Sequence, residues 1–171
     1  MATTTTPKWD AQVALLTSQF PKFQAKRFQD SKFWGWMKAN ILKFAAGITI
    51  GYTVYCDDDH FGTDRGVELL KHEGAHVYDW SKWWILYHIT YFLILPTVLT
   101  LRAVWEWRGY REDLRSIHEE YKNGEPAYYT YITDFYCQWV ASQFTGWNYL
   151  FMFPFKSFMY KKGQEFIKTL P

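Results

Sequence analysis

The residues whose spacing is best suited to chemistry are His72, Glu73 and His76, in the segment His-Glu-Gly-Ala-His. On a helix, the four-residue spacing places both imidazoles on one face, where they can bind a zinc ion. The Glu73 carboxylate, next to the first imidazole, would then take a proton from a water molecule on the metal. The chemistry of such a site is hydrolysis of a peptide bond.

Three features of the sequence argue against a metal centre at this motif. Gly74 weakens the helix on which the geometry depends. The polar segment around the motif is too short to build the usual protease cleft. A third ligand is also needed, and His60, Asp64 and Asp79 stand at no recognised spacing from the motif. We therefore expect no catalytic residue, no cofactor and no metal ligand, and an enzyme is not expected; a passive metal site is the alternative.

The elements around this motif include a long apolar segment. Trp83 to Leu101 contains no formally charged side chain and is mostly large and apolar. A helix that crosses the hydrocarbon of a bilayer needs about 20 such residues. We therefore predict a transmembrane helix over residues 83–104, with a kink at Pro96.

A second transmembrane helix is predicted over residues 34–56. Lys38 and Lys43 lie in its first half, where long side chains can reach the membrane interface. Gly47 and Gly51 form a GxxxG pair, which in lipid allows another helix to approach closely. The alternative is that these glycines are merely tolerated in a membrane helix.

The connection between the two predicted spans, residues 57–82, is predicted to be an acidic loop. Basic residues mark the outer ends of both spans, with Lys32 and Lys38 at the start of the first and Arg102 and Arg108 at or after the end of the second. Because basic residues mark the side that is not translocated, the pattern predicts a helical hairpin with both termini inside.

Three further segments complete the predicted organisation. Residues 1–33 form a basic N-terminal extension with a short amphipathic helix, residues 105–125 a charged helical extension, and residues 126–171 an aromatic amphipathic helix with a basic tail. The N-terminal helix lies on a membrane surface or is docked on another protein. The aromatic segment 135–155 suits a membrane surface or a groove in a partner, with a third span as the alternative. The predicted fold class is all-α: a membrane protein with a two-helix transmembrane hairpin plus amphipathic peripheral helices.

The composition limits the partners. A formal net charge of +2 gives no reason to expect nucleic acid as a ligand. Aromatic residues make up 22% of the chain, more than a small soluble core needs, and amphipathic rings are favoured at lipid headgroups.

No cleavable signal sequence is evident, and Cys56 and Cys137 are interpreted as free thiols. We expect other subunits of a large membrane complex and membrane lipids as partners, and no small-molecule substrate.

In layout, the chain resembles the supernumerary accessory subunits of mitochondrial inner-membrane complexes. The resemblance is carried by the small size, the uncleaved basic start, the predicted transmembrane hairpin, the acidic outer loop and the charged and aromatic extensions. It implies a non-catalytic subunit that stabilises or assembles the respiratory NADH dehydrogenase, with ATP synthase or cytochrome oxidase as alternatives. It also implies a multi-pass protein of the mitochondrial inner membrane with its termini in the matrix. The alternative from another class is a membrane-bound zinc metalloprotease that uses His72, Glu73 and His76.

Overall fold

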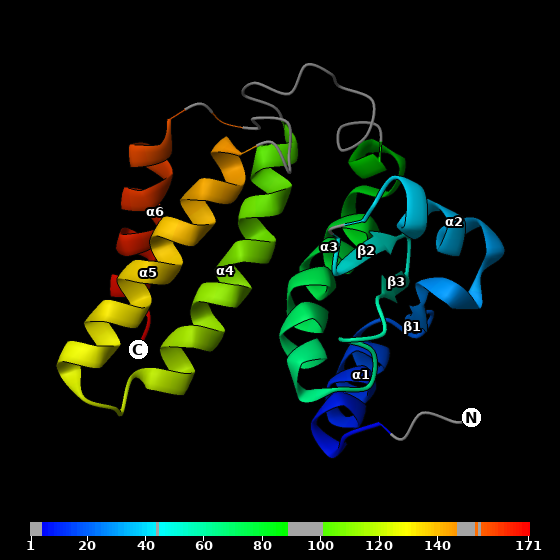
Figure 1. Cartoon of the computed structure of the whole chain (residues 1–171), viewed down its shortest axis with the longest axis horizontal. Helices are drawn as coiled ribbons and strands as arrows, with labels where there is room; N and C mark the ends of the chain where they lie inside the picture. The colour runs from blue at the N-terminus through cyan, green and yellow to red at the C-terminus, as the bar shows by residue number, and fades with distance from the viewer. Residues whose placement is uncertain (1–4, 44, 89–100, 147–152, 154) are drawn as a thin grey trace. The chain divides into compact units, whose positions relative to one another are not determined.

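The computed structural model describes residues 5–43, 45–88, 101–146, 153 and 155–171. The chain divides into two compact units, residues 1–84 (unit 1) and residues 85–171 (unit 2), and each is described by itself. The described residues form six α-helices and a small three-stranded sheet (Figure 1). The predominantly helical fold is thus confirmed, whereas the sheet corrects the prediction of an all-α chain.

Unit 1 combines helices with the sheet. Its elements are α1 (Pro7–Gln19), β1 (Gln24–Arg27), the 3-10 helix η1 (Phe28–Asp30), α2 (Lys32–Asn40), β2 (Gly47–Ile50), β3 (Thr53–Cys56) and the first part of α3 (Asp64–His88). The central strand β3 pairs in parallel with β1 and antiparallel with β2. The backbone of α3 leaves helical geometry at Trp84, where φ is 39° and ψ is −118°, and unit 1 ends at this residue.

The prediction of a transmembrane helix over residues 34–56 is wrong for the described residues, which form the end of α2 and a β-hairpin. Ile50 pairs with Thr53, so Gly51 and Tyr52 form the turn between β2 and β3. Gly51 has a φ of 64°, in the left-handed region that tight hairpin turns reserve for glycine. The flanking strands are rich in β-branched residues (Ile48, Thr49, Ile50, Thr53 and Val54), which favours a pleated strand over a helix. Gly47 and Gly51 therefore serve the hairpin and not a helix pair in lipid.

The second predicted span, residues 83–104, falls mainly on residues 89–100, which lie outside the described residues. Its two ends belong to α3 and to α4 (Leu101–Tyr121). In the described parts of the chain, no helix combines the length and the apolar character that crossing a membrane requires. The two-helix transmembrane hairpin of the predicted fold class is therefore not supported.

Helix α3 occupies most of the segment 57–82 that was predicted to be an acidic loop. The Thr63 hydroxyl caps its start by accepting a hydrogen bond from the Gly66 N–H at 3.2 Å, and Asp64 places a negative charge in the first turn. Leu70 and Val77, two helical turns apart, are both fully buried. Asp64, Glu68, Glu73 and Asp79 lie on an amphipathic helix with an apolar face, and the charge count alone did not reveal this periodicity.

The hydrophobic core of unit 1 lies between α1, the sheet and α3. It consists of Trp9, Leu16, Phe23, Val54, Cys56, Leu70 and Val77. Leu70 and Val77 turn one face of α3 into this core. The rotation of the helix about its axis is thereby fixed, and with it the directions of its other side chains.

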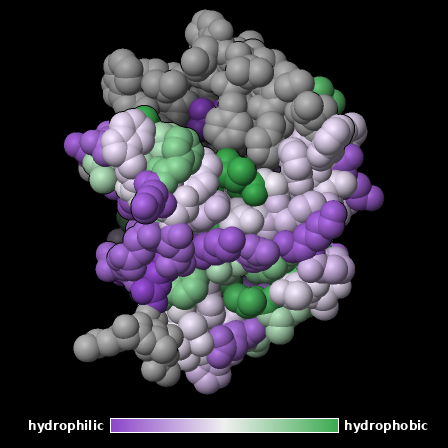
Figure 2. Space-filling view, turned by 90° about the vertical axis from the view of Figure 1, so that its right-hand side faces the viewer, coloured by the Kyte–Doolittle hydropathy of each residue, from purple (hydrophilic) through white to green (hydrophobic). Residues whose placement is uncertain are grey.

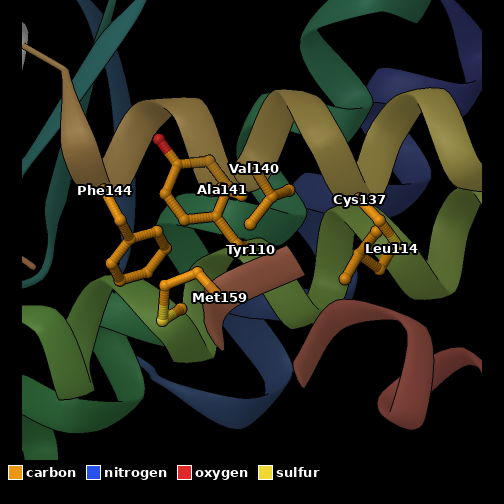
Figure 3. Close-up of a cluster of buried hydrophobic side chains, with 7 residues drawn as sticks. All are labelled: Tyr110, Leu114, Cys137, Val140, Ala141, Phe144 and Met159. Atoms are coloured by element: carbon orange, nitrogen blue, oxygen red, sulfur yellow. The ribbon is translucent and has the colours of Figure 1, made fainter. Parts of the chain in front are cut away.

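Unit 2 is built from α4, α5 (Pro126–Thr145) and α6 (Lys156–Lys168), which pack against one another. Their core is formed by Tyr110 and Leu114 of α4, Cys137, Val140, Ala141 and Phe144 of α5, and Met159 of α6 (Figure 3). The predicted amphipathic helix over residues 135–155 belongs to α5 as far as Thr145. Residues 147–152 and 154 lie outside the described part of the chain.

Candidate metal site on helix α3

The two histidines of the motif lie one turn apart in the middle of α3. Their ring centroids are 5.3 Å apart, with the ring planes at 71°. His72 and His76 are 9% and 3% exposed, so both imidazoles are withdrawn from water. The segment that was predicted to be an acidic loop is therefore a helix, as zinc binding by this motif requires, and the two imidazoles share one of its faces.

Glu73 points towards the sheet, where a threonine holds its carboxylate. The hydroxyl of Thr49 in β2 donates a hydrogen bond to Glu73 Oε2 at 2.6 Å and also lies 3.2 Å from the Glu73 carbonyl oxygen. Both side chains are buried. A buried carboxylate needs such a donor, because leaving it without hydrogen bonds is costly. The bond fixes the orientation of the carboxylate that stands between the two histidines in sequence.

Two glycines allow neighbouring elements to approach this part of α3. A Cβ atom at Gly74 would lie 2.9 Å from Leu16 Cδ2 of α1. A Cβ atom at Gly47 would lie 3.0 Å from Leu69 Cδ1 and 3.3 Å from Glu73 Oε1. Gly74 does not interrupt the helix, and its lack of a side chain lets α1 pack against the motif. The sequence-based objection to a helical motif at Gly74 is therefore removed.

The three side chains considered as a third ligand from the sequence have different surroundings. His60 Nδ1 lies 2.6 Å from Asp57 Oδ1, and Asp64 forms an ion pair with Lys8 at 3.5 Å. A hydrogen bond with Thr6, together with the charge of Lys8, lowers the pKa of the exposed Asp64 carboxyl. Asp79 is fully buried on α3, three residues after His76. Only Asp79 of these three shares the helical face of the histidines.

The buried polar residues that sequence reasoning missed include Thr49 and Glu106. Thr49 lies in a segment that was assigned to a membrane helix, and the run of β-branched residues from Ile48 to Ile50 could have placed it in a strand. Glu106 of α4 is 1% exposed, and its Oε1 lies 3.9 Å from Arg102 Nε within unit 2. Its neighbours in sequence are tryptophans, and no spacing distinguished it from the other acids of that helix.

The arrangement on α3 offers two imidazole nitrogens that are suited to zinc, and beside them a carboxylate, held by Thr49, that is suited to proton transfer. The chain matches no known protein-family model, no curated protein and no solved structure. The functional assignment therefore depends on the chemistry of these side chains.

Proposed function

We propose that this protein is a zinc-dependent hydrolase that cleaves peptide bonds, with His72 and His76 as metal ligands and Glu73 as the proton acceptor. The observation that carries this proposal is the helical conformation of the motif. It sets the two buried imidazole rings 5.3 Å apart. An i, i+4 histidine pair on one helical face is the arrangement that two-histidine zinc sites use.

His72 and His76 would hold the zinc ion, which would supply Lewis-acid chemistry. Glu73 would accept a proton from the water molecule that attacks the acyl carbon of the substrate. It would pass this proton to the amine nitrogen as the carbon–nitrogen bond breaks. One water molecule is consumed, and no oxidant or reductant is required.

A catalytic zinc site takes three protein ligands, so a side chain besides the two histidines is needed. Asp79 is seven residues from His72, about 10 Å along the axis of one helix, which is too far for a single ion to bind both. We therefore assign the two histidines alone as ligands, and Asp79→Asn should bind as much zinc as the wild-type chain.

The test is hydrolysis of unfolded casein by the purified full-length chain loaded with zinc. We expect activity that is lost on chelation and restored by zinc. Glu73→Gln should keep the metal and lower kcat/KM by about 100-fold or more. The control is Glu68→Gln, the same substitution at an exposed position of α3 where Glu68 pairs with Lys71 at 2.9 Å. Hydrolysis by Glu73→Gln at the wild-type rate would contradict the assigned role.

The prediction of a non-catalytic accessory subunit stays a prediction. No observation in the described residues bears on the mitochondrion, on a respiratory complex or on ATP synthase. The hydrolase is preferred because α3 supplies the helix on which the motif depends, and this helix was one of the three features that the sequence left in doubt.

A further inference from the structure

Helix α2 in unit 1 presents aromatic side chains to solvent. None of its residues is buried. Phe33 and Trp36, three residues apart and so on one side of the helix, are 60% and 55% exposed, and Ile41 after the helix is 59% exposed. Large apolar side chains gathered on one short element mark an interaction surface more often than scattered ones do.

The opposite side of α2 is held against the rest of unit 1. The Trp34 ring lies 5.4 Å from the Tyr55 ring of β3, and Lys38 Nζ donates a hydrogen bond to the Ala45 carbonyl oxygen at 2.6 Å. These contacts fix the orientation of the helix, so Phe33 and Trp36 are presented by a supported element.

The surface around these rings is positively charged. Residues 21–43 contain six basic residues and one acidic residue, a net charge of +5; the basic residues are Lys22, Lys26, Arg27, Lys32, Lys38 and Lys43. Asp57 and Asp58 lie within 4.0 Å of Lys38 and Arg27. Lys32 and Lys43 flank the exposed rings and are themselves exposed. Figure 2 shows strongly hydrophilic residues beside hydrophobic and weakly polar ones on the face of the molecule that carries unit 1.

We propose that the basic aromatic face, defined as Lys32, Phe33, Trp36, Ile41 and Lys43, binds the surface of a bilayer that contains anionic lipids. Aromatic rings are favoured at the level of the headgroups, and nearby lysines are attracted to anionic lipid. Apolar side chains flanked by lysines are the pattern of helices that lie in the membrane interface. A protein partner is disfavoured because lysine is depleted in protein–protein interfaces. This proposal is independent of the metal site.

The test is co-sedimentation of the full-length chain with vesicles. We expect binding to vesicles of phosphatidylcholine and phosphatidylglycerol in equal parts, weaker binding to phosphatidylcholine alone, and release by salt. Phe33→Ser with Trp36→Ser, and separately Lys32→Glu with Lys43→Glu, should each lower the partition coefficient by about tenfold or more. The matched control is Tyr131→Ser with Phe155→Ser, at similarly exposed rings of unit 2.

Unchanged circular dichroism spectra would establish that each variant is folded. The proposal is overturned if the wild-type chain does not bind anionic vesicles. It is also overturned if the α2 variants bind like the wild-type chain, since another segment would then make the contact. A dimer in solution that the α2 substitutions dissociate, without vesicle binding, would assign the face to a second copy of the chain.

Discussion

Among single residues, Thr49 has the clearest role at the site, because its hydrogen bond orients the Glu73 carboxylate. Thr49→Val keeps the shape of the side chain and removes the hydroxyl that donates to Glu73 Oε2. Because a buried carboxylate then loses a donor, we expect the free energy of unfolding to fall by about 1–3 kcal/mol. Urea denaturation followed by circular dichroism measures this change.

Thr53→Val is the matched control for that experiment. Thr53 lies in the neighbouring strand β3 and is partly exposed. Its substitution should change the free energy of unfolding by no more than about 0.5 kcal/mol. Equal effects of the two variants would show that the loss comes from strand packing and not from the Glu73 hydrogen bond.

The chemistry of the motif could be predicted from the sequence, but its surroundings could not. His72, Glu73 and His76 are adjacent in the chain, so helical periodicity alone relates their side chains. Thr49 reaches Glu73 from 24 residues away through the β2–β3 hairpin and the packing of the sheet on α3. A tertiary contact of this kind leaves no periodic signal in one sequence.

At the element scale, Gly66 determines how the first turn of α3 packs. A Cβ atom there would lie 1.9 Å from the His60 carbonyl oxygen and 2.6 Å from the Trp9 ring. Since the first of these is a backbone atom that cannot move aside cheaply, Gly66→Ala should lower the free energy of unfolding by more than about 2 kcal/mol. Thermal or urea unfolding gives the value.

The same substitution at Gly35 of α2, Gly35→Ala, should not lower the free energy of unfolding. The nearest atom to a Cβ at Gly35 is the Phe28 carbonyl oxygen at 3.5 Å, an ordinary contact. Alanine is the better helix former by about 1 kcal/mol, so this variant should be as stable as the wild-type chain or slightly more so. Destabilisation by Gly35→Ala as large as that by Gly66→Ala would contradict the packing described for α3.

The helices and strands of unit 1 also explain why two predictions from overall hydropathy and charge, a membrane helix over 34–56 and a loop over 57–82, were wrong. Residues 34–56 have the apolar content of a membrane helix, but β-branched residues and a turn glycine at Gly51 direct the second half into a hairpin. Residues 57–82 have the charge of a loop, but buried Leu70 and Val77 reveal the helix once the core is known. Overall hydropathy and charge therefore predicted the wrong elements, whereas β-branched content indicates the hairpin and apolar periodicity indicates the helix.

At the scale of the whole molecule, the two cysteines report separately on the two units. Cys56 is buried in unit 1 and Cys137 in unit 2. Burial, with contributions from Glu73 and Asp57, raises the pKa of the Cys56 thiol, and burial raises that of Cys137 to about 12. At pH 8 about one Cys137 thiol in ten thousand would be ionised.

In single-cysteine variants, we expect iodoacetamide to alkylate each thiol only under conditions that unfold the unit in which it lies. Reaction of the folded protein at the rate of a free peptide would contradict this burial.

The shifted pKa of Cys137 also predicts how stability depends on pH. The folded chain keeps the thiol proton up to about pH 12, whereas the unfolded chain releases it near the ordinary pKa of 9.0. The stabilisation is therefore complete below pH 9 and is lost as the pH rises from 9 towards 12. Urea denaturation at several pH values should show a steeper fall for the wild-type chain than for Cys137→Ala. Equal slopes for the two proteins would contradict the shift.

Zinc binding by His72 and His76 can be measured as the zinc content of the full-length chain after it has been loaded with zinc and dialysed. Elemental analysis by mass spectrometry should find about one zinc ion per chain in the wild-type protein. His72→Ala with His76→Ala should abolish binding, and His72→Cys, which keeps a ligand, should retain it in part. His60→Ala, which removes the histidine paired with Asp57, should leave the zinc content unchanged. A wild-type chain without zinc, or a double variant that binds as much zinc as the wild type, would contradict the proposed metal site.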